Sequence, residues 1–128
     1  MTSLLVLRGE DPPAEAAVVV RGGERGLDVD ILRRTATRTF EEYGFYGISV
    51  FVVLEGSLED LCRSVDEVRR YGRIRLSTAG DLRRAAFTLL STGRRPHFDI
   101  ALPDLADETL DRLRPCFGPL QSNPGRSS

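Results

Sequence analysis

Residues 41–56 read EEYGFYGISVFVVLEG, and this stretch decides the expected fold. Its second half, residues 48–54, is apolar or small at every position, which is typical of a strand covered on both faces of a sheet. Its first half places two tyrosines and a phenylalanine around Gly44 and Gly47, where that strand begins. Gly44 predicts the left-handed end of a preceding helix. We therefore expect an interior strand that directly follows a helix.

Strands and helices alternate along most of the chain in the predicted secondary structure. The strands cover residues 4–8, 16–23, 48–54, 73–77 and 97–103, and the helices cover residues 28–43, 57–71, 78–93 and 104–117. This order predicts an α/β or α+β fold, with a single mixed β-sheet of about five strands and about four helices. One globular domain is expected over residues 1–118, followed by a disordered polar tail over residues 119–128.

The composition excludes several kinds of chemistry. All 18 basic residues are arginine, so the chain has no lysine for a Schiff base or for a phosphate-binding loop. His97 is the single histidine, which excludes multi-histidine zinc sites. Cys62 and Cys116 lack the spacing of metal ligands, and Cys62 falls on an apolar helix face. We expect a reduced core thiol, no metal, no cofactor and a cytoplasmic location.

Charge and hydropathy limit the partners that the chain can have. The formal net charge of −1 argues against general coating of nucleic acid, which requires a basic excess. The first ten residues, MTSLLVLRGE, lack the pattern of a signal peptide, and residues 48–54 are too few to cross a membrane. We expect no membrane association. A nucleotide, an RNA or a protein partner stays open.

Two strand ends could receive an anion. Arg21 ends the strand VVVR and precedes Gly22 and Gly23, so the backbone amides of the turn could hold an anion that Arg21 clamps. The alternative is an ordinary turn with a solvated arginine. In RLSTAGD, Ser77 and Thr78 stand where a strand turns into a helix, and they could bind a phosphate or simply cap the helix.

Three further side chains could serve a site. Tyr46 lies between two glycines and could cover a flat ring, or it could simply pack, and Ser49 follows it on the same strand. His97 follows Arg94 and Arg95 at the start of a strand, and it is the one side chain suited to proton transfer near neutral pH. A surface histidine with a structural hydrogen bond is the alternative.

Four segments carry a resemblance to a known group of proteins. VVVRGG, YGFYGISVF, RLSTAGDLRRAAF and RPHFDIALPD resemble an uncharacterised family of small proteins from high-GC, actinobacterium-like genomes, over most of residues 16–118. The chain also resembles components of two-gene toxin–antitoxin pairs. An early-strand arginine followed by an aromatic-Gly-x-Ser strand is similar to ADP-ribosyltransferase-like folds. However, the Glu-x-Glu pair of those enzymes is missing, and Glu41 and Glu42 fall in a helix.

Two interpretations of function follow. In the first, the protein is a small binding module, one component of a two-gene pair, that meets a protein partner through the arginines of its helices. In the second, it is a small enzyme on a nucleotide, dinucleotide or RNA substrate, ADP-ribosyltransferase-like or nuclease-like. The second interpretation requires Arg21, Ser49, Arg75 and His97 to converge, with Ser49 and His97 catalytic and the arginines holding phosphate. Convergence in one cavity discriminates between the two.

Overall fold

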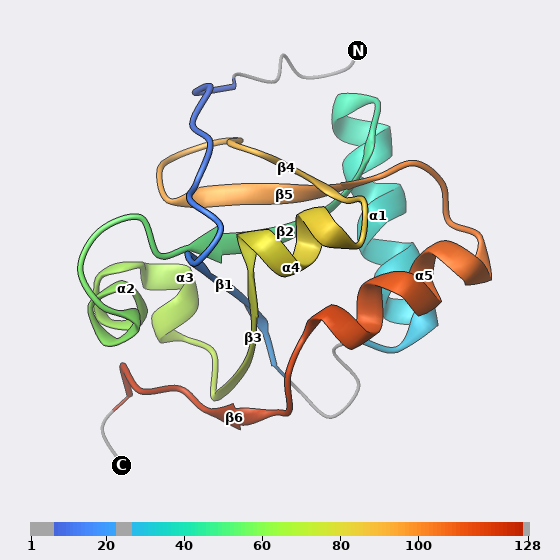
Figure 1. Cartoon of the computed structure of the whole chain (residues 1–128). Helices are drawn as coiled ribbons and strands as arrows, with labels where there is room; N and C mark the ends of the chain where they lie inside the picture. Colours follow the sequence, from blue (N-terminus) through green and yellow to red (C-terminus); the bar gives the residue numbers. More distant parts are fainter. Residues whose placement is uncertain (1–6, 23–26, 127–128) are drawn as a thin grey trace.

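The computed structural model describes residues 7–22 and 27–126 and has an α+β fold. Within these residues, helices pack on both faces of a single six-stranded sheet with the strand order β4-β5-β2-β1-β3-β6 (Figure 1). The strands are β1 (Ala17–Arg21), β2 (Tyr46–Val52), β3 (Arg73–Thr78), β4 (Thr88–Leu90), β5 (His97–Leu102) and β6 (Gln121–Ser122). The helices are α1 (Val29–Tyr43), α2 (Leu58–Ser64), α3 (Asp66–Arg69), α4 (Ala79–Arg84) and α5 (Asp107–Leu113), followed by the short 3-10 helix η1 (Arg114–Cys116).

The apolar strand β2 is interior, as the sequence predicts. It lies between β5 and β1, and its residues form part of two hydrophobic clusters on opposite faces of the sheet. Val50 and Val52 face the larger cluster, which is covered by α1, α4 and α5, whereas Phe51 faces the smaller cluster under α2 and α3 (Figure 1). The alternation of side chains along a strand thus assigns each residue of β2 to one of two environments.

Every strand pairing in the sheet is antiparallel, and the prediction of a mixed sheet is therefore wrong. Alternating helices and strands suggested parallel crossovers, but β1 and β2 are antiparallel although α1 connects them. The connection returns the chain beside the strand that it left, running the other way. This arrangement matters for the site, because two antiparallel neighbours begin at opposite ends of their shared ladder, so residues at their amino-terminal ends lie far apart.

The predicted helix over residues 78–93 is also wrong. Helix α4 ends at Arg84, Ala86 adopts a positive φ of 68°, and residues 88–90 form strand β4. Leu89 pairs with Ile100 of β5, so its side chain is buried by a strand partner rather than by helix packing. The apolar spacing at Leu82, Leu89 and Leu90 fits either structure, and a three-residue edge strand forms only because β5 lies beside it.

The other helix boundaries follow local signals. Gly44 ends α1 in the left-handed conformation, and its amide donates to Phe40 O at 2.8 Å. Ser57 begins α2 through a reciprocal capping box with Asp60, a pairing that lowers the pKa of that carboxyl. The single helix predicted over residues 57–71 is interrupted at Val65, whose extended backbone separates α2 from α3.

Residues 119–126 make specific contacts, although the sequence suggests a disordered tail. Strand β6 pairs with the start of β3, and Asn123 is buried, donating from Nδ2 to Val68 O at 2.8 Å and to Tyr71 O at 2.9 Å. Gly125 packs so closely on α2 that an added Cβ would lie 2.5 Å from the carbonyl carbon of Cys62. The segment therefore holds α2 and α3 against the sheet.

Strands β1 and β2 separate over half of their length, and this separation opens the centre of the sheet. Their register pairs Val18 with Val52 and Val19 with Phe51, whereas Arg21 pairs only with β3. The first half of β2 pairs only with β5. A gap thus forms between the carboxyl end of β1 and the middle of β2, beside α1.

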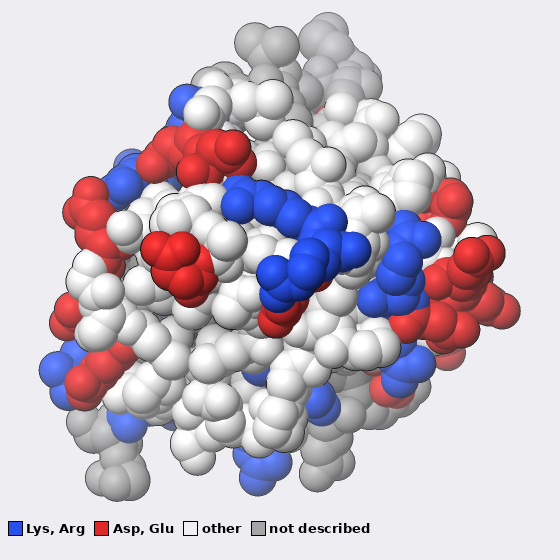
Figure 2. Space-filling model, viewed as in Figure 1, with Lys and Arg blue, Asp and Glu red and all other residues white. Residues whose placement is uncertain are grey.

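No described helix is long and apolar enough to span a bilayer. The surface charge of the described residues is mixed in sign. On the face drawn in Figure 2, arginine and carboxylate side chains lie next to one another, and neither sign covers the face. Ion pairs account for much of this mixing: Arg33 pairs with Asp107, and Arg84 pairs with Asp81. Such a surface differs from the continuous basic face with which proteins coat nucleic acid.

Candidate functional site

The register of two central strands places Ser49 beside His97. Ser49 of β2 lies opposite Asp99 of β5, and His97 is two residues from Asp99 on the same face of that strand. Diagonal neighbours of this kind lie within reach of a long side chain. The Ser49 Oγ and the His97 Nε2 are 2.6 Å apart, and the Ser49 side chain is exposed to solvent. The pair of residues proposed as catalytic from the sequence is therefore in direct contact.

The hydrogen bonds at the other imidazole nitrogen define the tautomer of His97. Its Nδ1 lies 3.1 Å from the carbonyl oxygen of Thr92, which can only accept, so Nδ1 carries the proton. The Thr92 hydroxyl, 3.0 Å from Nδ1, uses its own proton to donate to Asp99 Oδ2 at 2.6 Å. In the neutral ring, Nε2 is then an acceptor, and it receives the proton of the Ser49 hydroxyl. This is the arrangement of a serine activated by a general base.

Asp99 acts on His97 through Thr92 rather than by direct contact. Asp99 is 4% exposed, and its carboxylate accepts a hydrogen bond from the Thr92 hydroxyl next to the edge of the sheet formed by β4. Gly47 leaves the space for this carboxylate, because a Cβ at that position would lie 3.1 Å from Asp99 Oδ1 and 2.7 Å from Phe45 Cε2. Gly47, the second residue of β2, is thus required by close packing beneath the site.

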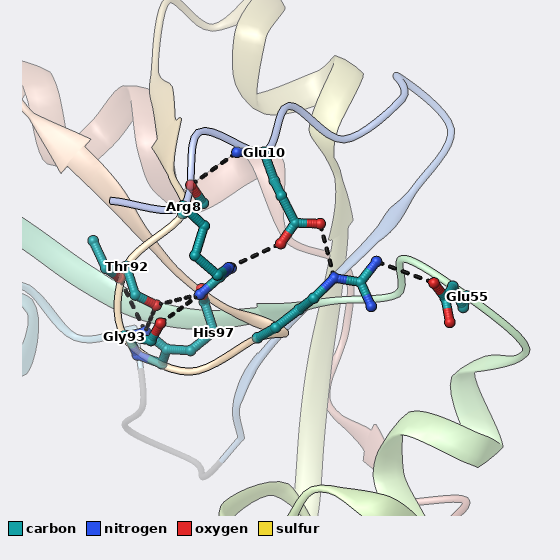
Figure 3. Close-up of polar contacts among 8 residues, drawn as sticks. Arg8, Glu10, Glu55, Thr92, Gly93 and His97 are labelled. Atoms are coloured by element: carbon teal, nitrogen blue, oxygen red, sulfur yellow. Dashed lines mark hydrogen bonds and ion pairs between the residues drawn. The ribbon is translucent and has the colours of Figure 1, made fainter. Parts of the chain in front are cut away.

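The loop that carries Thr92 and His97 is fastened to the N-terminal segment of the described chain (Figure 3). The Arg8 guanidinium donates to Thr92 O, Gly93 O and His97 O, each at 2.8 Å. Glu10 accepts hydrogen bonds from Arg95 and from Arg8. Both bonds lower the pKa of the Glu10 carboxyl, and the bond from Arg95 has the larger effect. Arg8 therefore fixes the same carbonyl that orients the imidazole.

The imidazole plane is fixed by an aromatic neighbour. Phe51 lies opposite His97 in the β2–β5 register, and the two rings meet edge to face with their centroids 5.2 Å apart. Phe51 is buried in the smaller hydrophobic cluster, so the contact ties the imidazole to the core. The ring is therefore restrained by hydrogen bonds at both nitrogens and by packing on one side.

Two cavities meet at Ser49 and Tyr71, which line both of them. The first cavity, of about 510 Å³, occupies the gap between β1 and β2 beside α1, and Arg21 and Arg38 line it. The second, of about 420 Å³, lies between α3 and the loop before β5, and His97 lines it together with side chains of both charges. These volumes are within the range of small-molecule sites.

Tyr71 contributes a phenol to the boundary between the two cavities. Burial raises the pKa of Tyr71, which outweighs the opposing effect of nearby Arg21, so the hydroxyl keeps its proton at neutral pH. The side chain can therefore donate a hydrogen bond to a ligand in either cavity. The sequence identified Tyr71 only as the end of a helix.

The structure brings together some of the residues proposed from the sequence and separates others. Arg21, Gly22, Ser49 and His97 lie around the two joined cavities. The Gly22 amide is not free for an anion, because it donates to Arg73 O at 2.9 Å, and an added Cβ would lie 2.5 Å from that carbonyl group. Gly22 thus serves the pairing of β1 with β3. Gly23 lies outside the described residues.

Arg75 and Tyr46 do not join this group, so the four-residue convergence that the enzyme interpretation requires is met only in part, by Arg21, Ser49 and His97. Arg75 lines a different cavity, with Asp111 and Arg114, and donates to Gly118 O at 3.2 Å. Tyr46 pairs with Leu102 at the far end of β5, and its ring stacks on Phe40 with centroids 4.6 Å apart. The antiparallel register explains the separation, because His97 at the start of β5 lies opposite the end of β2 and not opposite its beginning.

Ser77 and Thr78 also have structural roles. Ser77 is buried, and its hydroxyl donates to Thr78 O at 3.4 Å. The Thr78 hydroxyl accepts from the Asp81 amide at 3.1 Å and caps α4, which is only six residues long. The arrangement is that of an ordinary N-cap.

Thr92, Asp99 and Arg8 were missed by the sequence analysis. Asp99 had a signal, because His97 and Asp99 alternate with apolar residues and therefore share one face of the strand. Thr92 had none, since the segment that contains it reads as a helix end, and Arg8 is far from His97 in sequence. These groups come together because β4 and β5 form a hairpin and because the N-terminal segment of the described chain folds back beside it.

The residues that the structure describes hold no group of three or more His, Cys, Asp or Glu side chains placed to bind a metal. Cys62 and Cys116 are both free thiols, and burial raises the pKa of each. Comparisons of the chain with protein-family models, with curated proteins and with solved structures find no match.

Proposed function

We propose that this protein is a small enzyme in which Ser49 is the nucleophile and His97 its general base, acting on an ester or phosphoester bond near an anionic group. One observation carries the proposal: the 2.6 Å contact from Ser49 Oγ to the accepting Nε2 of His97, exposed where two cavities meet. A lone histidine that served only the fold would not need an exposed serine as its partner. The Thr92–Asp99 pair supplies the orientation that such a base requires.

The reaction follows from this geometry. As Ser49 Oγ attacks the electrophilic atom, its proton passes to His97 Nε2, and a new bond forms from Oγ to that atom. The bond to the leaving group breaks, and the leaving group takes the proton from the imidazolium. Water then attacks the covalent intermediate, gives a proton to Nε2 and releases the second product, and the Ser49 hydroxyl regains that proton. Arg94 and the Tyr71 phenol line the cavities in which negative charge develops.

The arginine pairings favour this enzyme over the binding module. The binding interpretation relied on Arg33, Arg34, Arg38, Arg83 and Arg84 as a surface for a partner. Three of these arginines are ion-paired within the chain: Arg33 with Asp107, Arg83 with Asp11 and Arg84 with Asp81. A protein partner, including one encoded as the second half of a two-gene pair, stays a prediction without a described surface of its own.

A covalent serine probe tests the proposal. The purified chain is incubated with a fluorophosphonate, and the modified residue is located by mass spectrometry. We expect one adduct per chain, at Ser49, with release of fluoride. His97→Ala should slow labelling by about 100-fold or more, the scale of general-base catalysis.

Ser64→Ala is the matched control, since Ser64 lines the second cavity but its hydroxyl donates to Asp60 O. It should label at the rate of the unaltered chain, and circular dichroism should show that every variant is folded. Absence of an adduct at Ser49, or labelling that is equally fast without the imidazole, would exclude Ser49 as an activated nucleophile.

A further inference from the structure

The cavity between β1 and β2 has a composition that the chemistry at Ser49 does not explain. One wall is apolar and is formed by Val20, Ile31, Leu32 and Ile48. The rim carries two guanidinium groups, from Arg21 at the end of β1 and from Arg38 on α1. A cavity that only admitted water to Ser49 would need neither feature.

The two guanidinium groups lack partners in the described part of the chain. No ion pair or side-chain hydrogen bond joins the guanidinium of Arg21 or Arg38 to another described residue, and no described carboxylate lines this cavity. By contrast, Arg33 on the same helix is paired with Asp107. Two like charges around one cavity repel each other, and an anion between them removes that repulsion.

The separation of the strands gives this cavity a suitable size and position. Its volume of about 510 Å³ fits a ligand of mononucleotide size and exceeds what a bare phosphate needs. Ser49 lies on its boundary, so a ligand held here would present a bond to the nucleophile. The Tyr71 hydroxyl, which keeps its proton, adds a donor at the same boundary.

We propose that this cavity binds the phosphate-bearing part of the substrate, an organic monophosphate with a flat apolar group, of which a mononucleotide is the representative. Arg21 and Arg38 hold the phosphate by charge-assisted hydrogen bonds. The apolar wall, formed by Val20, Ile31, Leu32 and Ile48, covers the flat group. The inference rests on the proposed function for the identity of this ligand as substrate. The binding itself requires only the cavity.

Binding is measured on the Ser49→Ala variant, which cannot form a covalent intermediate. The probes are AMP, adenosine and inorganic phosphate, each titrated by isothermal calorimetry at low salt. We expect AMP to bind at least tenfold more tightly than either adenosine or inorganic phosphate, because only AMP uses both the guanidinium groups and the apolar wall. Arg21→Gln and Arg38→Gln, each added to Ser49→Ala, should weaken AMP at least tenfold and leave adenosine unchanged within twofold.

Arg34→Gln is the matched control, since Arg34 is an exposed arginine of α1 that does not line the cavity. It should change the affinity for AMP by less than twofold. Equal affinity for AMP and adenosine, or an equal loss in the Arg34 and Arg38 variants, would overturn the phosphate site. Equal affinity for AMP and inorganic phosphate would overturn the role of the apolar wall.

The two proposals fail in different ways. If the fluorophosphonate does not modify Ser49 while AMP binds as described, the cavity is a nucleotide site without serine chemistry. If Ser49 is labelled in a manner that depends on His97 while AMP does not bind, the enzyme proposal holds and the assigned substrate class is wrong.

Discussion

The two faces of strand β2 differ in what covers them. On one face, Ile48, Val50 and Val52 are buried in the larger hydrophobic cluster beneath α1, α4 and α5. On the other face, Phe51 is buried in the smaller cluster, and Ser49 is exposed. The strand alternates between these environments at every residue, so a fully buried core residue and the proposed nucleophile are separated by a single position.

The difference arises from how far each layer of helices extends. The 15-residue helix α1 covers β2 on one face, whereas α2 and α3 are short and face Ser49 across a cavity. The described chain thus leaves the middle of its central strand uncovered on one side only. Rigid packing behind the strand holds Ser49 and the hydrogen-bonded His97 in place, as a preorganised site requires.

The same substitution on opposite faces tests this comparison most strongly. Val50→Asp places an unpaired charge at a position with no solvent exposure and should cost at least about 4 kcal/mol, which leaves little of a typical domain's stability. Ser49→Asp, one residue earlier, is exposed, and its charge faces Asp99 across the strands, so it should cost at most about 1 kcal/mol. Thermal melts followed by circular dichroism measure both, and equal destabilisation would show that the two faces are equally buried.

Thr92→Val tests whether the orienting group acts on chemistry. The change keeps the shape and the backbone carbonyl but removes the hydroxyl that connects His97 to Asp99, and the rate of fluorophosphonate labelling should fall by about 30-fold, less than in His97→Ala. Thr92→Ser retains the hydroxyl and should restore labelling to within about threefold of the original rate. Slow labelling in both variants would mean that the methyl group, and not the hydrogen bond, positions the ring.

Asn123→Ala tests the support of the open face. Its amide satisfies two backbone carbonyls at the end of α3, and their loss should lower the free energy of unfolding by about 1–3 kcal/mol. Gln121→Ala changes an exposed side chain nearby and should stay within about 0.5 kcal/mol of the original protein. Denaturant unfolding measures both, and similar values would mean that residues 119–126 do not stabilise the helices.

Arg8→Gln should have a smaller effect than the Thr92 change, because the imidazole keeps its own hydrogen bonds. We expect labelling of Ser49 to slow by about tenfold, since the charge-assisted bonds to the loop carbonyls are lost. Arg95→Gln is the control, because Arg95 binds Glu10 but donates to no carbonyl of the loop. An equal effect of the two variants would show that Glu10, and not Arg8, holds the loop.

The pH dependence of that contact has a defined sign. Since the pKa of Glu10 is lowered by hydrogen bonds from Arg95 and Arg8, its contribution to stability is present above the carboxyl's ordinary pKa of 4.5. The contribution is lost as the pH falls through the lowered value. Protection factors for the amides of residues 93–95 and 97, which correct for the pH dependence of intrinsic exchange, should therefore stay constant down to pH 4.5 and fall only below it, whereas Glu10→Gln should show no such change.

Much of the fold could be predicted because local patterns determine it. The apolar run from Ile48 requires an interior strand, Gly44 requires the end of a helix, and the alternation after His97 requires a half-buried strand. The division of residues 78–93 could not be predicted, since the reversal at Ala86 has no glycine to mark it and β4 depends on a partner distant in sequence. The antiparallel register was equally inaccessible.

The candidate site was predictable only in part, for a related reason. Ser49 and His97 were identified by residue type, because a single histidine leaves few choices for proton transfer. Their contact depends on the diagonal register of β2 and β5, and the Thr92–Asp99 pair depends on the hairpin. Tyr46 was misplaced for the same reason, as parallel strands would have brought it near His97 whereas antiparallel strands move it away.

The lengths of the outermost strands have a consequence for solubility. The sheet ends in β4, which has three residues, and in β6, which has two and lies between Pro119 and Pro124. Such short edge strands, one of them flanked by prolines, offer few unpaired amides to another chain and therefore resist edge-to-edge association. Removal of the residues after Gly118 would expose the edge of β3, which is six residues long. The unpaired amides and carbonyls of that strand could then pair with another chain, and the truncated protein should aggregate more readily.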